Sequence, residues 1–357
     1  MGDQAPSSSA TGSADTASSP SRCEPTPPLD ELKPPTPYVP GAQLRIKKHN
    51  PPPPMGGAGY SHPHPKEWDW QPYPRGKGAP KTLSQWCLKH LPRKTPPHFD
   101  QSVHRLVITR QICCGEGLNS QVVECRLDNG PELFVAKIFD GLYIDDTDVV
   151  DDLGPTYYVE SWYSREAAAY KRILEHNLDG RFTPSFKGCW HFEVPLLDGK
   201  PREVRMILLE SVPGSTMKSL VDSGEAKRID PGLRLELMAQ LMENCSTLDF
   251  IGLRQNDMAT RNILVDTKSK RITLIDFSHS RMWGEPTSKW EEWGDPTLPA
   301  SPISLFKGFW PVYGAEEWVP RELCSWEESL EWMKKRWDNS GRYQPVDYED
   351  DVLPPCY

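Results

Sequence analysis

The sequence contains none of the patterns that mark a secreted, membrane-spanning or disulfide-rich protein. Its N-terminus has no apolar core of the signal-peptide type, and nowhere do 18 apolar residues follow one another. The nine cysteines are odd in number, are scattered through the chain and include no Cys-x-x-Cys pair, which favours a reducing compartment. We therefore expect an intracellular protein, cytoplasmic or nuclear, with no membrane partner.

The chain also has fewer basic than acidic residues. The chain has 41 Lys and Arg against 50 Asp and Glu, a formal net charge of −9. This balance argues against a nucleic-acid-binding surface covering the whole protein, and we expect no nucleic-acid partner. The length of 357 residues is enough for two lobes or about two domains.

Residues 1–100 differ in composition from the rest of the chain. They hold 21 of the 37 prolines, an opening rich in Ser, Ala and Thr, and the run Pro51-Pro52-Pro53-Pro54. Such a segment buries too little apolar area to offset its ordering entropy, so we expect it to be disordered or locally polyproline II. Two interpretations stay open, a ligand for a proline-recognising module and a solvated tail.

Alternating apolar patterns predict strands from about residue 103 onward. The predicted strands cover residues 105–112, 122–127, 133–139, 186–192 and 203–209. Helices are predicted over residues 161–176, 231–250 and 326–337. The acidic stretch 140–160 is predicted to be a solvated loop.

A glycine-rich turn separates the first two predicted strands. Gly115 and Gly117 have no Cβ, so backbone N–H groups there can approach phosphate oxygens closely, although an ordinary hairpin turn explains the same pattern. Lys137 lies among apolar residues on the third strand. A buried ammonium there needs an anionic partner, and the alternative is an edge-strand lysine that reaches solvent.

Three polar residues follow the helix at 231–250. Asp257 and Asn262 lie in a loop, and Asp276 comes just after the second strand of a predicted hairpin, residues 263–275. The hairpin can bring the three together. Two carboxylates and an amide at strand ends suit a site for Mg²⁺ and phosphate, because this hard cation takes oxygen ligands.

In order and spacing, these residues resemble the protein-kinase-like superfamily, including its fungal kinase-like and aminoglycoside-phosphotransferase-like members. Asp257 and Asn262 have the catalytic-loop spacing Asp-x-x-x-x-Asn, and Asp276-Phe277-Ser278 resembles the magnesium-binding Asp-Phe-Gly motif. Val135-Ala136-Lys137-Ile138 resembles the Val-Ala-Ile-Lys strand. The turn matches Gly-x-Gly-x-x-Gly-x-Val in part, with Ser120 in place of the third glycine.

The resemblance implies an α+β, bilobal kinase-like fold with a small antiparallel-sheet N-lobe, residues 103–212. A mainly helical, abbreviated C-lobe would follow over residues 213–357 and end in a tail rich in Trp and Pro. ATP and Mg²⁺ would be the cofactors, and the phosphate acceptor, a protein or a small molecule, stays open.

The resemblance also implies a role for each matching residue. The catalytic residues would be Asp257, Lys137, Glu166 and Arg261. The nucleotide would contact Gly115, Gly117, Ser120, Val122, Lys137, Glu210 and Val212, and Mg²⁺ would be held by Asn262 and Asp276. Glu166 would pair with Lys137, with Glu160 as a competing partner, and Arg261 is otherwise a surface arginine.

Three departures keep two functional hypotheses open. Gln255-Asn256 stands where a kinase has His-Arg, Ser278 replaces a glycine, and no Ala-Pro-Glu follows. One hypothesis is an active enzyme that transfers the γ-phosphate of Mg·ATP to a hydroxyl group. The other is a pseudokinase that binds nucleotide or acts as a scaffold.

Overall fold

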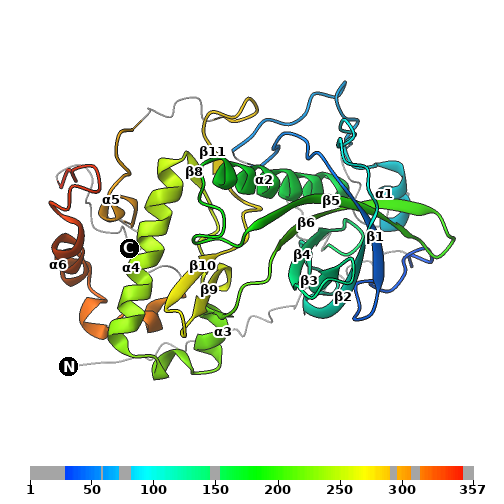
Figure 1. The fold of residues 1–357 in the computed structure, drawn as a ribbon. Helices are drawn as coiled ribbons and strands as arrows, with labels where there is room; N and C mark the ends of the chain where they lie inside the picture. The colour runs from blue at the N-terminus through cyan, green and yellow to red at the C-terminus, as the bar shows by residue number, and fades with distance from the viewer. Residues whose placement is uncertain are drawn as a thin grey trace, which may run out of the picture.

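The computed structural model describes residues 29–57, 59–71, 82–144, 153–289, 296–306 and 314–348. A six-stranded antiparallel sheet lies on one side of the molecule, and a mainly helical part lies on the other (Figure 1). The long helix α2 (Pro155–Glu175) runs between the two. No helix in these ranges is long and apolar enough to cross a membrane.

The sheet closes into a barrel with the strand order β1-β2-β3-β4-β6-β5. The strands are β1 (Gln43–Lys48), β2 (His104–Cys113), β3 (Gln121–Leu127), β4 (Phe134–Phe139), β5 (Phe186–Pro195) and β6 (Pro201–Glu210). Five of the six confirm the strands predicted from alternation, with ends that differ by a few residues. Inward-facing apolar side chains such as Leu106, Val123 and Leu208 form the barrel's own buried core.

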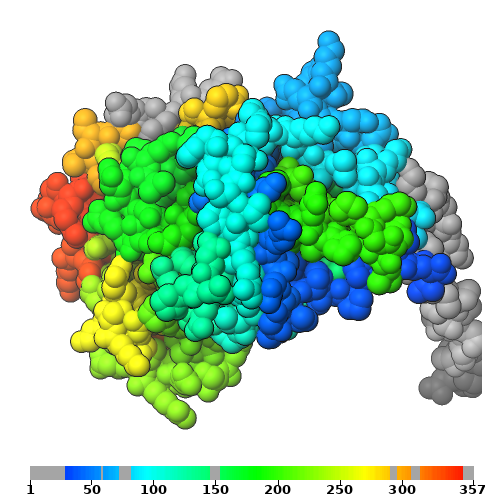
Figure 2. All heavy atoms as spheres, turned by 45° about the vertical axis from the view of Figure 1, so that its right-hand side comes forward, coloured from blue at the N-terminus to red at the C-terminus, as the bar shows by residue number. Residues whose placement is uncertain are grey.

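The remaining strand, β1, was not predicted and lies within the segment expected to be disordered. It pairs with β2 on one side and β5 on the other, and thereby closes the barrel. Tyr38 and Ile46 are fully buried in the core. In the space-filling view, the blue N-terminal residues pack directly against the green strands (Figure 2). The expectation of disorder over residues 1–100 is therefore wrong for the described residues from 29 onward.

The physical reason is local. The proline-free sequence Gln43–Lys48 alternates exposed and buried residues, a pattern that the average composition of the segment conceals. Pro52 and Pro54 of the proline run are also buried, whereas Pro53 is exposed. A proline-recognising partner for this region stays a prediction. The prediction of disorder for residues 1–28 and 72–81 lies outside the described residues.

Helix α2 begins six residues earlier than the predicted range 161–176. Gly154 precedes it in an extended conformation, and Pro155 takes the first helical position, where its fixed φ and missing N–H are compatible with a helix. The final residues of the acidic stretch 140–160 thus belong to the helix.

The prediction that this stretch is a solvated loop is wrong at both of its ends. Asp140 is 2% exposed and pairs with Arg202, and Glu160 is 1% exposed. Each carboxylate is compensated by an arginine or a backbone N–H, which local sequence does not reveal. The middle, residues 145–152, lies outside the described part of the chain.

The rest of the chain is mainly helical. Its helices are α1 (Leu83–Lys89), α3 (Met217–Asp222), α4 (Pro231–Phe250), α5 (Pro302–Phe306) and α6 (Trp326–Trp337). Short 3₁₀ helices cover Ala226–Arg228, Thr260–Asn262, Glu316–Trp318 and Arg321–Leu323. The short strands are β7 (Ser215–Thr216), β8 (Leu253–Arg254), β9 (Ile263–Asp266), β10 (Arg271–Leu274) and β11 (Arg281–Met282). Helices α4 and α6 and the β9–β10 hairpin confirm the sequence predictions.

A second hydrophobic core joins α2, α4, the β9–β10 hairpin and the C-terminal helices, and it includes Phe277 and Trp318. The predicted boundary at residues 212 and 213 separates β6 from this helical part, but α2 packs into the second core. The division into two kinase-like lobes remains a proposal.

The burial of β1 predicts a large effect of one substitution in the N-terminal segment. Replacing Ile46 with Ala removes buried apolar contacts, so the free energy of unfolding should fall by about 2–4 kcal/mol in denaturant titrations. Arg45→Ala, at an exposed position of the same strand, should change it by less than about 0.5 kcal/mol. Equal, negligible effects of both substitutions would contradict an integral β1.

Candidate functional site

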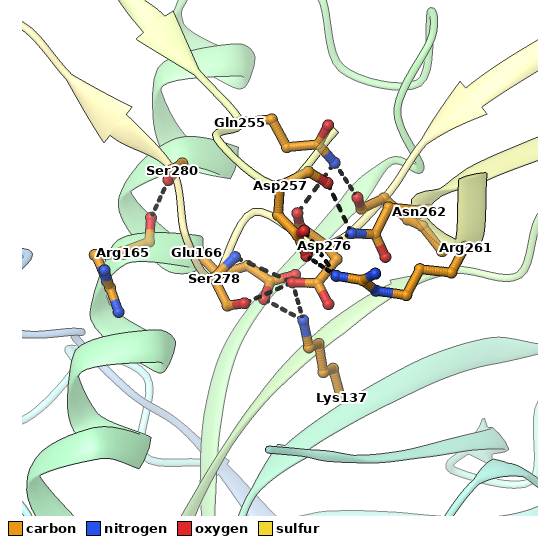
Figure 3. A network of polar contacts seen from close by, with 11 residues as sticks. Lys137, Arg165, Glu166, Gln255, Asp257, Arg261, Asn262, Asp276, Ser278 and Ser280 are labelled. Atoms are coloured by element: carbon orange, nitrogen blue, oxygen red, sulfur yellow. Dashed lines mark hydrogen bonds and ion pairs between the residues drawn. The ribbon is translucent and has the colours of Figure 1, made fainter. Parts of the chain in front are cut away.

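Lys137 links three elements of the structure. It lies on β4 directly opposite Val122 of β3 and Ile207 of β6. Its Nζ is 2.6 Å from Oε2 of Glu166 on α2 and 2.7 Å from Oδ1 of Asp276 (Figure 3). Lys137 is 6% exposed and Glu166 fully buried, so the ammonium is not an edge-strand group that reaches solvent.

Glu160, the competing partner, lies elsewhere. Its carboxylate accepts a hydrogen bond from the backbone N–H of Arg93 and lies 3.7 Å from Nε of Arg205. Of the two acidic residues considered, the structure therefore brings only Glu166 to Lys137.

The three charges perturb one another's pKa values. Burial acts to lower the pKa of Lys137, but the charges of Asp276 and Glu166 outweigh it and raise this pKa. Burial raises the pKa of Glu166 to about 7, because Lys137 offsets the loss of solvation only in part and Asp276 adds repulsion. Burial acts in the same direction on Asp276, yet the charge and hydrogen bond of Lys137 hold its pKa below the ordinary value.

Asp276 is held in an unusual backbone conformation. Its φ is +62°, in the left-handed region that non-glycine residues rarely adopt. The Gln255 side chain donates to the backbone carbonyls of Ile275 and Asp276, and the Ser278 hydroxyl donates to Oδ1 of Asp276 at 2.6 Å. Gln255, which replaces the expected His, thus helps to fix the segment carrying Asp276.

Phe277 anchors the other side of this segment. Its ring is fully buried and meets the ring of Tyr170 on α2 edge-on, with centroids 5.3 Å apart. Because Tyr170 is one helical turn after Glu166, α2 contacts both Lys137 and the residue following Asp276.

Asp257 forms a second polar cluster with residues that follow it. Nη2 of Arg261 donates to both carboxylate oxygens of Asp257, at 2.7 and 2.8 Å. Nδ2 of Asn262 donates at 2.9 Å to the backbone carbonyl and to Oδ2 of Asp257. The 3₁₀ helix Thr260–Asn262 places both donors beside the carboxylate.

The glycine-rich turn is braced by a residue that sequence analysis missed. The Gln121 side chain accepts from the N–H of Gly115 at 2.7 Å and donates to its carbonyl at 2.8 Å. Gly115 and Gly117 have φ values of +153° and +76°, which require or favour glycine. Gln121 has a polar side chain, yet the residue is only 1% exposed. Gln121 directly precedes the predicted strand 122–127 and shares a face with Val123 and Cys125, so starting that strand one residue earlier would have identified it.

A polar cavity of about 120 Å³ lies where these elements meet. The residues that line it are Asn119, Ser120, Lys137, Phe139, Trp162, Asp257, Arg261, Asp276, Ser278 and His279. Of the predicted site residues, Ser120, Lys137, Asp257, Arg261 and Asp276 line the cavity, and Glu166 lies behind Lys137.

Other predicted residues lie outside this lining. Gly115, Gly117, Val122 and Asn262 are in neighbouring positions of the same turns and strands. Glu210 and Val212 lie at the end of β6, where the Glu210 carboxylate accepts from the N–H and hydroxyl of Ser185.

Sequence analysis also missed Trp162 and His279 as lining residues. Trp162 precedes Glu166 by four positions, so the two share a helix face, and this spacing could have indicated it. His279 follows the Asp276-Phe277-Ser278 segment directly. Burial and the nearby charge of Arg165 lower the pKa of its imidazole, which favours the neutral form at pH 7.

Two oxygen atoms near the cavity are of the kind that binds Mg²⁺. Asp276 uses Oδ1 for Lys137 and Ser278, and Asn262 uses its Nδ2 for Asp257. Oδ2 of Asp276 and Oδ1 of Asn262 have no hydrogen-bond partner among the described residues. Both are hard oxygen donors of the kind that Mg²⁺ takes, so this pair fits the ion.

No protein-family model matches the chain, and no curated protein matches its sequence. Among solved structures, the chain is similar to the kinase PK-1 of the Cydia pomonella granulovirus, with 16% sequence identity and a TM-score of 0.35. The match covers 50% of this chain and 55% of that kinase, so this chain spans about half of the kinase's length. A likeness of this extent does not define a fold family.

The charge cluster predicts a pH-dependent cost of removing its cation. In Lys137→Met, Glu166 and Asp276 lose their counter-ion, so their folded-state pKa values should rise above the unfolded values. The folded state then binds more protons, and stability falls as the pH rises. We expect the free energy of unfolding to drop by about 3–5 kcal/mol at pH 8 and clearly less at pH 5.5.

The matched control is Lys218→Met, which breaks an exposed ion pair with Asp222 on α3. Denaturant titrations should show a change below about 1 kcal/mol at both pH values. A loss of equal size at pH 5.5 and pH 8 in Lys137→Met would argue against the described charge coupling.

Proposed function

We propose that this protein is an ATP-dependent phosphotransferase of protein-kinase-like fold, with the barrel and the helical part as its two lobes. The observation that carries the proposal is the buried Lys137 ammonium between Glu166 and Asp276, at the wall of a polar cavity that Asp257 shares. A buried ion triad contributes little stability over well-packed apolar residues, so its presence beside a cavity favours a functional role.

Lys137 is the proposed ligand of the nucleotide phosphates. Its ammonium has two anionic partners in this structure, and Asp276 is the one at the cavity wall. Phosphate oxygens would take the place of Asp276, while Glu166 keeps the ammonium in position from behind. Gly115, Gly117 and Ser120 would cover the phosphates from the turn above, and backbone groups of Glu210 and Val212 would hold the adenine.

Asp276 and Asn262 are the proposed Mg²⁺ ligands, through the two oxygens without a hydrogen-bond partner. The ion, when bound, neutralises charge on the phosphate oxygens. The backbone strain at Asp276 and the brace of Gln255 would keep its carboxylate turned to the cavity.

Asp257 is the proposed acceptor of the hydroxyl proton. Its carboxylate is occupied by Arg261 and Asn262, so an incoming hydroxyl must compete with Arg261, whose side chain is 58% exposed and free to move. Once displaced, the Arg261 guanidinium would lie at the cavity wall, where positive charge stabilises the transferring phosphoryl group.

The alternative function is nucleotide binding without transfer, as in a pseudokinase. The observation that favours it is the same occupation of Asp257, since Arg261 contacts both of its oxygens and Asn262 also contacts one. If this arrangement persists with nucleotide bound, the paired carboxylate is a weaker base for the acceptor hydroxyl, and the protein would act through its bound state.

Phosphate transfer from labelled Mg·ATP distinguishes the two functions. In an active enzyme, Asp257→Asn and Asp276→Asn should each lower the rate by about a hundredfold or more, because each removes a carboxylate that acts on the reacting groups. Asp222→Asn, at an exposed site on α3, should leave the rate unchanged.

Thermal shift with Mg·ATP provides the second readout. Wild-type protein should be stabilised by the nucleotide, and Lys137→Met should lose that stabilisation. A shift without any transfer supports the pseudokinase, and the absence of nucleotide binding by the wild type refutes both functions.

A further inference from the structure

A second set of contacts involves the N-terminal residues 49–57 and 59–62, which we call the strap. In Figure 1 the blue strap passes along α2 and reaches the gold segment that follows β11. The strap thus connects α2, which carries Glu166, with the segment that follows Asp276 and β11.

The strap contacts α2 on two faces, because Tyr157 and Ser161 share one face whereas Tyr163 lies on the face that carries Glu166. The hydroxyl of Ser161 donates to the backbone carbonyl of Met55 at 3.0 Å, and the Tyr157 hydroxyl hydrogen-bonds to Nδ1 of His62. Nδ1 of His49 lies 2.5 Å from the hydroxyl of Tyr163. All these α2 residues are buried, so their hydroxyl groups depend on the strap instead of water for hydrogen bonds.

Two glycines allow the strap to approach α2 closely. Gly56 and Gly57 have φ values of +68° and +63°. A Cβ on Gly56 would lie 2.7 Å from the Tyr157 hydroxyl, and one on Gly57 would lie 2.5 Å from Nη1 of Arg165. Side chains at these two positions would therefore push the strap away from the helix.

Arg165, directly before Glu166, is the residue that the strap covers. It is 7% exposed, and no carboxylate of the described residues forms an ion pair with it. Its Nε donates to the carbonyl of Ser161 at 3.1 Å. In Figure 3 its guanidinium points away from the Lys137 cluster, toward the opposite side of α2. Gly57 of the strap and Lys137 thus approach α2 from different sides.

The other edge of the strap is attached to the segment after β11. The Ser61 N–H donates to the carbonyl of Thr287 at 2.8 Å, and the Lys289 N–H donates to the carbonyl of Gly59 at 3.1 Å. The Thr287 hydroxyl donates to the carbonyl of Pro54 at 2.7 Å. The strap therefore bridges α2 and a segment that begins about ten residues after Asp276.

Besides the strap, α2 contacts the helical part at several points. The Ser280 hydroxyl donates to the carbonyl of Arg165, and Tyr170 packs against Phe277. Further contacts lie at the C-terminal end of α2. There Arg172 donates to the carbonyls of Ile251 and Trp283 and pairs with Glu285. The turn of α2 that carries Glu166 lies between this end and the strap contacts. Restraint on both sides keeps the buried Glu166 carboxylate against Lys137.

We propose that the strap is a positioning element for α2, and that Ser161 and Thr287 are positioning residues which keep Glu166 in contact with Lys137. The proposal rests on the phosphotransferase function for its consequence in activity. Its structural part, the restraint of α2 by the strap, stands independently of that function.

The test compares two double variants of the full chain. Ser161→Ala with Thr287→Val removes two hydroxyl donors to strap carbonyls and leaves every cavity residue in place. The control, Ser246→Ala with Thr247→Val, removes two hydroxyl groups of α4. These groups donate to the backbone carbonyls of Ala300 and Glu243. Both pairs lose the same chemical groups, so a general loss of stability should be similar.

Amide hydrogen exchange of residues 157–170 is the first readout. The strap variant should exchange about tenfold faster or more in this helix, because two hydrogen bonds that restrain it are lost, and the control should exchange like the wild type there. The single variant Thr287→Ser, which keeps wild-type Ser161, retains both hydroxyl groups and should exchange as slowly as the wild type. Equal exchange in the strap and control variants would overturn the proposal.

Phosphate transfer from Mg·ATP is the second readout. The strap variant should lose about tenfold or more in kcat relative to the control, with the loss reversed in Thr287→Ser. Faster α2 exchange with unchanged transfer by an active wild type would overturn the positioning role. If the wild type transfers no phosphate, the phosphotransferase function fails by itself, and the exchange comparison alone decides whether the strap holds α2.

Discussion

The structure depends on one buried ammonium shared by two carboxylates. Lys137 lies on a central barrel strand, Glu166 on the long helix, and Asp276 just past the β9–β10 hairpin. Each of the three would be costly to bury alone. Their mutual contacts of 2.6 and 2.7 Å therefore require the barrel, the helix and the hairpin to keep fixed relative positions.

The surroundings of this triad are rigid on the protein side and open on the cavity side. Phe277 packs against Tyr170 behind Asp276, and Gln255 bonds to the backbone of the same segment. Glu166 is enclosed, whereas the side chain of Asp276 is 33% exposed. This asymmetry suits a group that exchanges partners, since the carboxylate nearest the cavity can leave the ammonium and the enclosed one cannot.

The N-terminal strap helps to fix the orientation of α2. It carries buried polar residues on several faces, among them Ser161, Ser164 and Arg165, so apolar packing alone does not orient it. The strap gives Ser161 a hydrogen-bond partner at Met55, whereas Ser164 and Arg165 bond to the Ser161 carbonyl within the helix. A segment rich in proline and glycine serves here because glycine permits close approach and proline limits the entropy lost on ordering.

The sequence by itself determined the elements whose signal is local. Five barrel strands, α4, α6 and the hairpin follow from alternation and helical spacing within a few neighbouring residues. The polar positions Lys137, Asp257 and Asp276 were recognisable from their order and spacing relative to these elements. Gln121 was missed because it lies just before the predicted strand 122–127, and Trp162 was missed although its i, i+4 spacing to Glu166 marked it.

Only the tertiary structure decided the features that depend on distant partners. The pairing of β1 with β2 and β5 and the burial of Asp140 against Arg202 each rely on residues far away in the chain. So do the left-handed conformation of Asp276 and the choice of Glu166 over Glu160. Burial and charge pairing are properties of the folded environment, and average composition conceals them wherever a short ordered segment lies among prolines.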